Sequence, residues 1–305
     1  MSDLRAVVFA YSEVGHDCLD ELLNRGVRVE ALFTHEDAQC EELWFPSAAG
    51  RAREAGVPVF TPETLGDEEY RLLQAIRPDA IFSFYYRSMI GERFLTLAPR
   101  GAFNLHGSLL PKYRGRACIN WAVLMGERET GGTLHYMVKR ADAGDIVDQQ
   151  RVPIHFDDTA FDVGKRVAEA ARLVVGRNID AIRAGTVRAR PQDEAAATYF
   201  GRRTPADGRI DWSRGAFEIY NLVRAVTRPF PGAFAYAQGE KIFIWKAFPE
   251  DCPPLAPPGT VLSTCPLRVM TGRGRLRIIS TRREGGPEMD GEALARGLGE
   301  GLKFE

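Results

Sequence analysis

The chain has 305 residues, of which 45% are hydrophobic and 27% charged, so it is long and apolar enough to bury a core without disulfides. Its 40 basic and 41 acidic residues give a net charge of -1, which excludes a general electrostatic attraction to nucleic acid. The sequence has no run of about 18 apolar residues and no signal-peptide cleavage pattern, so we expect a cytoplasmic protein without membrane insertion.

Predicted strands and helices alternate along the first part of the chain. The predicted strands cover residues 5–11, 27–35, 57–61, 79–86 and 100–106. The predicted helices cover residues 14–23, 45–56, 67–78 and 120–127. Such alternation is typical of a parallel sheet with helices on both faces. A change follows at residues 130–140 and 144–154, where two strands are predicted around the loop "ADAGD".

The remainder of the chain predicts a second domain. A long helix is expected at residues 160–184, and a Pro- and Gly-rich stretch after it places a boundary near residue 200. One more helix, at about 216–227, precedes short strands separated by Gly and Pro turns, which favour a small barrel or an open antiparallel sheet. We therefore predict an α/β catalytic domain over residues 1–200, with a Rossmann-like, mostly parallel sheet, followed by a small OB-like β-barrel domain over residues 201–305.

Several cofactor and metal sites are disfavoured. The first strand-to-helix turn, "FAYSEVGHD", lacks the G-x-G-x-x-G glycines that admit a pyrophosphate, so we expect no NAD. No two of the five His have metal-ligand spacing, so no metal is expected. The cysteines are odd in number and form no C-x-x-C pair, which predicts reduced thiols. They are Cys18, Cys40, Cys118, Cys252 and Cys265.

The segment "GAFNLHGSLLPKYRGRA" at residues 101–117 carries the strongest candidate chemistry. Alternation along a strand places Asn104 and His106 on one face, at the carboxyl end where open α/β sheets bind ligands. An amide that donates to an oxyanion beside an imidazole that moves a proton suits acyl transfer to an amine. A capping Asn and a packed His are the alternative interpretation.

Charged residues near this segment complete the candidate site. A carboxylate is needed to orient or charge the imidazole, and the loop "ADAGD" offers Asp142 and Asp145, for which local turn hydrogen bonds are the alternative. Lys112, Arg114 and Arg116 follow His106 and either bind an anion or form a solvated loop.

These residues resemble a known family. "FNLHGSLLPKYRG" and the later "DAGDI" are similar to the signature of the folate-dependent formyltransferases, and the resemblance covers the whole chain. "FSFYYR", "MVKRADAGDIV", "FGRRTPADG" and "PGAFAY" are similar to members that formylate UDP-4-amino-4-deoxy-L-arabinose, in lipid A modification and polymyxin resistance. The sequence lacks the NAD-dependent decarboxylase half of a bifunctional member, so a standalone enzyme and an excised part of a longer protein are both considered.

The resemblance implies a role for each site residue. Asn104 would stabilise the oxyanion, His106 would act as general acid and base, and Asp142 would raise the pKa of His106. The implied co-substrate is 10-formyltetrahydrofolate. Its expected contacts are Arg116, Val138, Lys139, Arg140, Ala141, Asp142, Phe84, Tyr85 and Leu109; for Phe84, Tyr85 and Leu109, core packing is the alternative.

The acceptor separates three hypotheses. A UDP-amino sugar needs one or two cations for its phosphates, and Arg202 and Arg203 are candidates. A methionyl-tRNA formyltransferase needs a basic insertion after the second strand, whereas "THEDAQCEELWFPS" contains acidic residues and no Lys or Arg, so we expect no tRNA. A non-catalytic folate- or nucleotide-binding protein is the third, and the intact set of Asn104, His106 and Asp142 argues against it.

Overall fold

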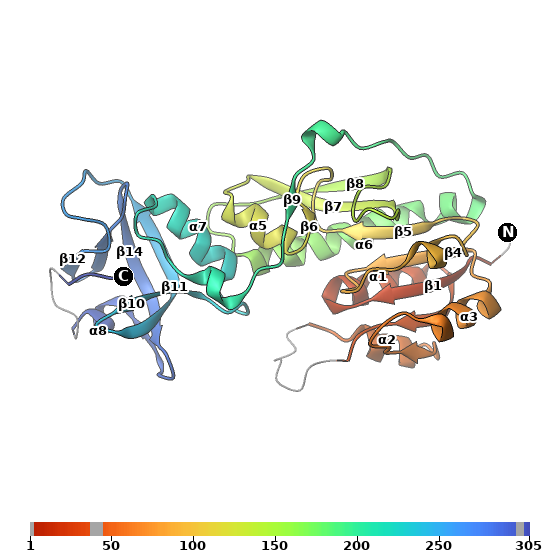
Figure 1. The fold of residues 1–305 in the computed structure, drawn as a ribbon, viewed down its shortest axis with the longest axis horizontal. Helices are drawn as coiled ribbons and strands as arrows, with labels where there is room; N and C mark the ends of the chain where they lie inside the picture. Colours follow the sequence, from red (N-terminus) through yellow and green to blue (C-terminus); the bar gives the residue numbers. More distant parts are fainter. Residues whose placement is uncertain (1–2, 37–44, 297–301) are drawn as a thin grey trace. The chain divides into compact units, whose positions relative to one another are not determined.

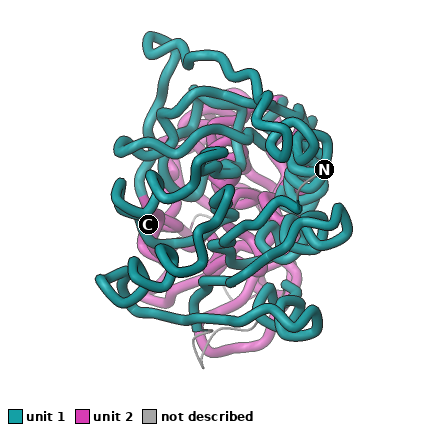
Figure 2. Tube along the Cα trace, turned by 90° about the vertical axis from the view of Figure 1, so that its right-hand side faces the viewer, with its two compact units in different colours: residues 1–118, 129–153, 164–201 teal, residues 119–128, 154–163, 202–305 magenta. Residues whose placement is uncertain are grey.

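The computed structural model describes residues 3–36, 45–296 and 302–305 (Figure 1). The chain divides into two compact units (Figure 2). Unit 1 comprises residues 1–118, 129–153 and 164–201, and unit 2 comprises residues 119–128, 154–163 and 202–305. Two short segments that precede residue 200 thus belong to unit 2, which a single boundary does not anticipate. None of the described helices is both long and apolar enough to cross a membrane.

Unit 1 is built on a sheet that is seven-stranded within the described residues, in the order β3-β2-β1-β4-β5-β7-β8. The pairs among β1 to β5 are parallel, and β7 and β8 are added antiparallel, so the expected Rossmann-like, mostly parallel sheet is confirmed. The strands are β1 (Arg5–Ala10), β2 (Arg28–Phe33), β3 (Val59–Phe60), β4 (Ala80–Phe84), β5 (Ala102–His106), β7 (Glu129–Tyr136) and β8 (Ile146–Pro153).

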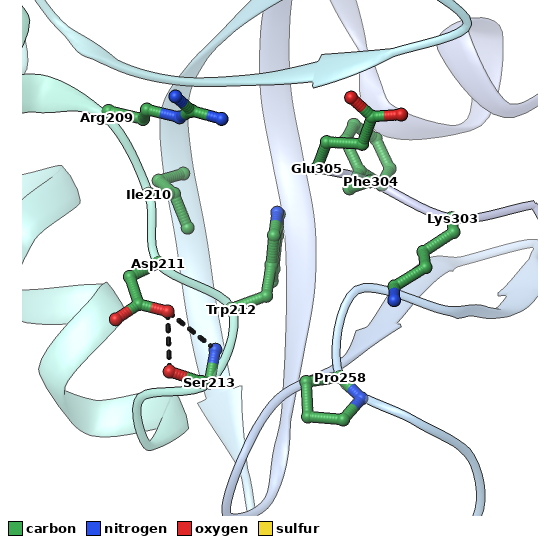
Figure 3. Close-up of a pocket in the computed structure, with 9 residues that line it drawn as sticks. All are labelled: Arg209, Ile210, Asp211, Trp212, Ser213, Pro258, Lys303, Phe304 and Glu305. Atoms are coloured by element: carbon green, nitrogen blue, oxygen red, sulfur yellow. Dashed lines mark hydrogen bonds between the residues drawn. The ribbon is translucent and has the colours of Figure 1, made fainter.

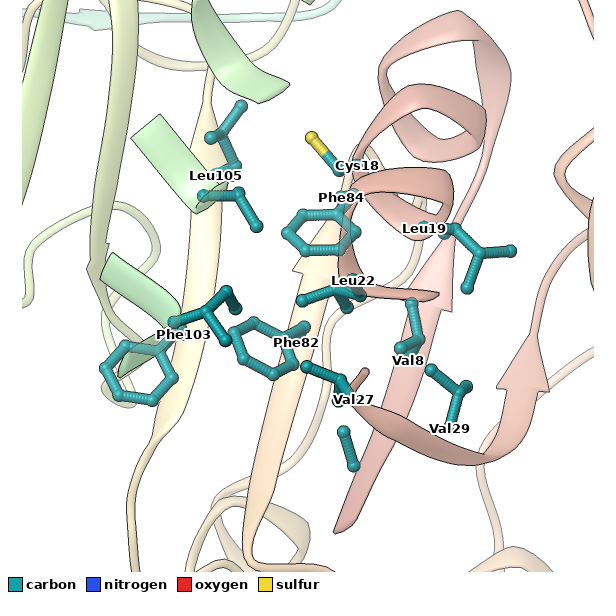
Figure 4. Close-up of a cluster of buried hydrophobic side chains, with 14 of the residues drawn as sticks. Val8, Cys18, Leu19, Leu22, Val27, Val29, Phe82, Phe84, Phe103 and Leu105 are labelled. Carbon is teal, nitrogen blue, oxygen red and sulfur yellow. The ribbon is translucent and has the colours of Figure 1, made fainter. Parts of the chain in front are cut away.

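Helices cover both faces of this sheet because alternate side chains of each buried strand point to opposite sides. On one face, Val8 and Phe82 pack with buried residues of α1 and α6 (Figure 4). On the other face, Phe9 and Ile81 pack with residues of α3 and α4. The helices of unit 1 are α1 (Ser12–Asn24), α2 (Ala48–Glu54), α3 (Asp67–Ile76), α4 (Glu92–Leu95) and most of α6 (Ala160–Ala184). Helix α5 (Cys118–Leu124) belongs to unit 2 except for its first residue.

A small parallel pair lies outside this sheet. Strand β6 (Arg114–Gly115) pairs with β9 (Tyr199–Phe200), and a single turn of 3-10 helix (Glu194–Ala196) precedes β9. Sequence patterning missed both strands because two residues are too few for any periodicity. The pairing ties the loop after β5 to a segment about 85 positions later in the chain.

Unit 2 contains an antiparallel sheet in the order β10-β11-β14-β13-β12, with β15 paired to β14. The terminal segment bonds to both edges, through Glu305 to Tyr236 of β10 and through Phe304 to Gly259 before β12. It thus links the two edges, as a barrel-like sheet requires. The elements are a 3-10 turn (Pro205–Gly208), α7 (Ala216–Val226), β10 (Ala233–Ala237), β11 (Glu240–Glu250), β12 (Val261–Thr264), β13 (Leu267–Met270), β14 (Arg275–Arg283), β15 (Glu288–Asp290) and α8 (Gly291–Ala295).

Candidate active site

Strand β5 presents two different faces. Phe103 and Leu105 point into the core that α1 and α6 cover, so the alternate residues Asn104 and His106 lie on the opposite face. On β7, His135 is the residue directly opposite Asn104, and Thr133 is opposite His106. The strand therefore delivers an amide and an imidazole side by side at its carboxyl end, with a second imidazole on the neighbouring strand.

One carboxylate oxygen joins these groups. Asp142 Oδ1 lies 3.5 Å from the amide nitrogen of Asn104, 3.6 Å from His106 Nδ1 and 3.7 Å from His135 Nε2. Asp145, the other carboxylate of the same loop, is exposed to solvent. The structure thus brings Asn104, His106 and Asp142 together, and it adds His135, which the sequence analysis did not assign to the site.

The loop between β7 and β8 holds Asp142 in an unusual backbone conformation. Its φ is 55°, a left-handed value that a non-glycine residue adopts only when its surroundings fix it. The Gly115 N–H donates to Asp142 Oδ2 at 2.9 Å. Gly144 lies so close to the chain that an added Cβ would be 1.8 Å from the Tyr136 carbonyl oxygen. Backbone contacts therefore set where this carboxylate stands.

His106 is buried, and its Nε2 lies 2.7 Å from the Tyr113 carbonyl oxygen, which can only accept, so Nε2–H donates. Burial alone would lower the pKa of His106, but the Cys118 sulfur and the Asp142 carboxylate raise it above its ordinary value. The ring nitrogen that faces Asp142 is Nδ1.

His135 is held neutral. Burial, reinforced by the charge on His106, lowers its pKa to about 4 against the attraction of Asp142. Nδ1 lies 2.8 Å from the Tyr136 carbonyl and must donate to it, so Nε2 accepts from the Asn104 amide at 3.0 Å. The pKa values of the two imidazoles are therefore shifted in opposite directions. A polar residue inside the buried strand "GGTLHY" was the sequence signal for His135.

The expected co-substrate contacts lie in two loops of unit 1. Val138, Lys139, Arg140 and Ala141 are exposed on the loop before Asp142, and Arg116 is exposed after β6. Arg140 already forms an ion pair with Glu194 at 3.0 Å, and Arg116 donates to the Arg87 carbonyl at 3.3 Å. Contact of these residues with a ligand stays a prediction.

Three aromatic or aliphatic contacts were expected to line the pterin. Phe84 is fully buried in the core beside Phe82, so the core-packing alternative applies and we remove it from the candidate ligand contacts. Tyr85 has a left-handed φ of 59°, and its hydroxyl would lie 1.8 Å from a Cβ added at Gly107. Leu109 is half-buried, and its side chain packs against Gly131.

The candidate cations differ in how deeply they are buried and in what they contact. Lys112 is exposed, whereas Arg114 is fully buried and bonded to Gln192 and Glu194, so Arg114 neither lies in a solvated loop nor is free to hold an anion. In unit 2, Arg203 stacks on Trp121 at 4.7 Å. Arg202 is exposed.

Three further expectations concern metal binding, the cysteines and the acidic segment after the second predicted strand. Within residues 3–36, 45–296 and 302–305, no cluster of His, Cys, Asp and Glu can hold a metal ion. Cys18, Cys118, Cys252 and Cys265 are free thiols. Asp37, Glu41 and Glu42 of the acidic segment lie outside the described residues, as does Cys40.

Unit 2 contains a cavity of about 580 Å³ that shares no residue with the Asp142 cluster (Figure 3). Its lining includes Trp212, Lys303 and Phe304, and Asp211 there accepts two hydrogen bonds from Ser213. Charges of both signs line it, and the carboxylate of Asp211 is satisfied locally. Cavity size therefore does not identify the candidate active site, whereas the convergence of Asn104, His106 and Asp142 does.

In this Rossmann-like sheet, an amide, an imidazole and a carboxylate meet at the end of one strand. This arrangement is typical of enzymes that transfer an acyl group, because the amide and the imidazole can stabilise the oxyanion that forms at the carbonyl. The family described as "Formyl transferase" matches residues 5–178, more than half of the chain, and "Formyl transferase, C-terminal domain" matches residues 202–299. The chain belongs to the formyl transferase family.

Solved structures share this fold at low identity. An N-formyltransferase from Helicobacter canadensis, in complex with folinic acid and dTDP-3-aminofucose, is 21% identical with a TM-score of 0.71, over 91% of this chain and 99% of that one. WlaRD, a sugar 3N-formyl transferase solved with dTDP and 5-N-formyl-THF, is 19% identical with a TM-score of 0.68, over 90% and 97%.

HypX from Aquifex aeolicus, in complex with tetrahydrofolic acid, is also similar. It is 19% identical with a TM-score of 0.65, over 97% of this chain and 47% of HypX. The chain thus spans about half the length of HypX. At these identities the likeness shows a common fold.

Proposed function

We propose that this protein transfers the formyl group of 10-formyltetrahydrofolate to the amine of a UDP-linked amino sugar. The convergence of Asn104, His106 and Asp142 in a chain of the formyl transferase family carries the proposal. Solved proteins of the same fold bind folinic acid or tetrahydrofolic acid, and one of them also binds a dTDP-amino sugar, which supports a folate co-substrate and a nucleotide-sugar acceptor.

The role of each site residue follows from its chemistry. Asn104 Nδ2 donates one hydrogen to His135. Its second hydrogen faces Asp142 Oδ1, but the 3.5 Å between Nδ2 and Oδ1 is too long for a strong hydrogen bond. That second hydrogen can turn toward an oxyanion. His106 holds a proton because the Cys118 sulfur and the Asp142 carboxylate raise its pKa, and Nδ1 is the atom from which the proton can pass.

The reaction is an acyl transfer between two nitrogens. The unprotonated amine of the sugar attacks the formyl carbon, and the carbonyl electron pair moves to oxygen as the new C–N bond forms. Asn104 and His106 stabilise that oxyanion. Collapse of the intermediate breaks the bond to N10 of the folate. The attacking nitrogen loses one proton and N10 gains one, with His106 or water as the carrier, so charge balances.

The particular acceptor we propose is UDP-4-amino-4-deoxy-L-arabinose, with a related UDP-amino sugar as the alternative. Segments such as "FSFYYR" and "MVKRADAGDIV" resemble the formyltransferase half of the bifunctional polymyxin-resistance enzyme ArnA. On this resemblance we propose a role in lipid A modification and polymyxin resistance. A cytoplasmic location stays a prediction of the sequence.

Arg203 is the residue we propose to bind the nucleotide phosphates. Burial lowers the pKa of Arg203, and its Nε has no hydrogen-bond partner among the described residues, so an anion would improve its surroundings. Arg203→Ala is expected to raise KM for the UDP-sugar about 10- to 10²-fold, because a charge-assisted hydrogen bond contributes roughly 1.5–3 kcal/mol. Lys303→Ala, a cation of the unit 2 cavity, is the control, and an unchanged KM in Arg203→Ala would remove the residue from the site.

The decisive experiment incubates the purified protein with 10-formyltetrahydrofolate and separate acceptors, followed by mass spectrometry. The acceptors are UDP- and dTDP-amino sugars and charged initiator tRNA. A mass gain of one formyl group on a UDP-amino sugar supports the proposal. Formylation of the tRNA alone would make the protein a methionyl-tRNA formyltransferase, and no formylation of any amine would leave a binding protein.

A further inference from the structure

Residues 190–200 of unit 1, which we call the strap, run from the start of β8 to β6. At one end, Arg190 and Ile146 exchange backbone hydrogen bonds of 2.8 and 2.9 Å. At the other end, the Arg114 N–H donates to the Thr198 carbonyl and the Arg116 N–H to the Phe200 carbonyl. The strap therefore bonds to the start of β8, which directly follows the loop that carries Asp142, and to strand β6.

A buried guanidinium anchors the strap. The side chain of Arg114 is fully buried, so its charge must be compensated inside the protein. Glu194 binds it through both carboxylate oxygens, at 2.6 and 3.1 Å, and the Tyr199 hydroxyl accepts a further bond. Gln192 Oε1 accepts from Nε at 3.1 Å and from Nη2 at 2.7 Å. These bonds use the acceptor end of the Gln192 amide.

The donor end of the same amide reaches the Asp142 loop. Gln192 Nε2 donates to the carbonyl of Asp142 at 2.8 Å and to the carbonyl of Gly144 at 2.7 Å. All four hydrogen-bonding positions of one amide are thereby used. The two carbonyls belong to the left-handed residue itself and to the glycine two positions on, so Gln192 fixes the backbone turn that aims the Asp142 carboxylate.

We propose that Gln192 is a positioning residue for the formyl transfer proposed above, on which this inference rests: it holds the Asp142 carboxylate against Asn104 and His106. A residue that only stabilised the fold would contribute to stability without changing the interaction between Asp142 and His106. The titratable groups that face Asp142 are His106 on β5, His135 on β7 and Tyr85 after β4. Cys118 on α5 acts on His106, and Arg114 on β6 acts on His135.

The test replaces Gln192 by Met, which keeps the length of the side chain and removes its hydrogen bonds. NMR titration of the His106 ring, without substrates, should give a pKa below that of the wild type, shifted toward the value in Asp142→Asn. The kcat should fall by up to about 10²-fold, the loss that a misplacement near 1 Å can cause. KM for the acceptor should stay within about twofold, because ground-state binding is not touched.

Asp193→Ala is the matched control. It removes a hydrogen bond of the same strap, from the Ala195 N–H to the Asp193 carboxylate at 3.0 Å, without touching the Asp142 loop. It should leave the His106 titration and kcat unchanged. Gln192→Asn provides a milder variant, since its amide is one methylene too short to span Arg114 and both carbonyls.

An unchanged His106 pKa in a folded Gln192 variant would overturn the inference, and so would a failure of both variants to fold, which would make Gln192 a structural residue. The titration needs no turnover. If the wild type formylates no amine, the proposed function fails while the His106 pKa still decides whether Gln192 positions Asp142.

Discussion

The end of strand β5 in unit 1 and the cavity of unit 2 both carry charged side chains, but they are organised in opposite ways. At β5, three side chains lie within 3.7 Å of one carboxylate oxygen, and two histidines have pKa values displaced in opposite directions. The cavity offers about 580 Å³, yet its Asp211 is satisfied by Ser213, one of the residues that line it. Convergence of groups, and not volume, marks the place where chemistry is expected.

The largest expected effect is a loss of activity when the β5 site is changed, with no loss when the cavity is changed. Asn104→Ala and His106→Ala should each lower kcat about 10²- to 10³-fold, because each removes a group that stabilises the oxyanion. Folate binding, measured by fluorescence titration, should be largely kept. Lys303→Ala in the cavity should keep full activity. If His106→Ala kept more than about a tenth of wild-type turnover, the role of His106 at the oxyanion would be contradicted, because the loss expected for an oxyanion donor is far larger.

A pair of glycines sharpens the comparison. An added Cβ would lie 1.8 Å from the Tyr136 carbonyl oxygen at Gly144 and 1.8 Å from the Ser213 carbonyl oxygen at Gly272. Each Gly→Ala variant should therefore lose about 1–3 kcal/mol of stability, the usual cost of overpacking, as measured by urea denaturation.

Only one of these two variants should also lose activity. Gly144→Ala displaces the loop that carries Asp142, so its turnover per folded molecule should fall strongly. Gly272 lies against Ser213 and Trp212, which line the cavity, so Gly272→Ala should turn over normally once corrected for the folded fraction. Equal turnover in the two variants would show that the loop tolerates displacement.

The smallest expected effect is a difference in pH dependence. The pKa of His135 is about 4 in the folded protein and 6.5 ordinarily, so between these values the unfolded chain binds a proton that the folded protein does not. Stability should fall as the pH drops through that window, by at most about 1.4 kcal/mol per pH unit. His106, with a raised pKa, contributes stability that is complete below pH 6.5 and lost as the pH rises.

His135→Gln should flatten the acid loss between pH 6.5 and 4, followed as the urea midpoint against pH. Asp211→Asn is the counterpart in the cavity. Hydrogen bonds from Ser213 lower the pKa of Asp211 below its ordinary 3.8, so its contribution is present above that value and is lost only below it. A loss between pH 6.5 and 4 that persists in His135→Gln would assign the proton to another group.

Much of the fold was predictable because it depends on local periodicity. Nearly continuous apolar runs such as "RAVVFA" and "AIFSF" became β1 and β4, and the helix expected at residues 160–184 became α6 with the same bounds. The antiparallel pair β7–β8 around "ADAGD" was also predicted. By contrast, β6 and β9 were missed, since a two-residue strand carries no period and forms only when a distant partner supplies its hydrogen bonds.

The sequence by itself determined that Asn104 and His106 share a face, because strand alternation is a local rule. It left Asp142 and Asp145 as alternatives until the family resemblance favoured Asp142, and it assigned Arg114 to a surface loop or an anion site. Only the tertiary structure decided that Asp142 faces the imidazoles, that Arg114 is buried, and that His135 and Gln192 belong to the same network. Those contacts join residues up to 80 positions apart, and no local pattern encodes a distance across the fold.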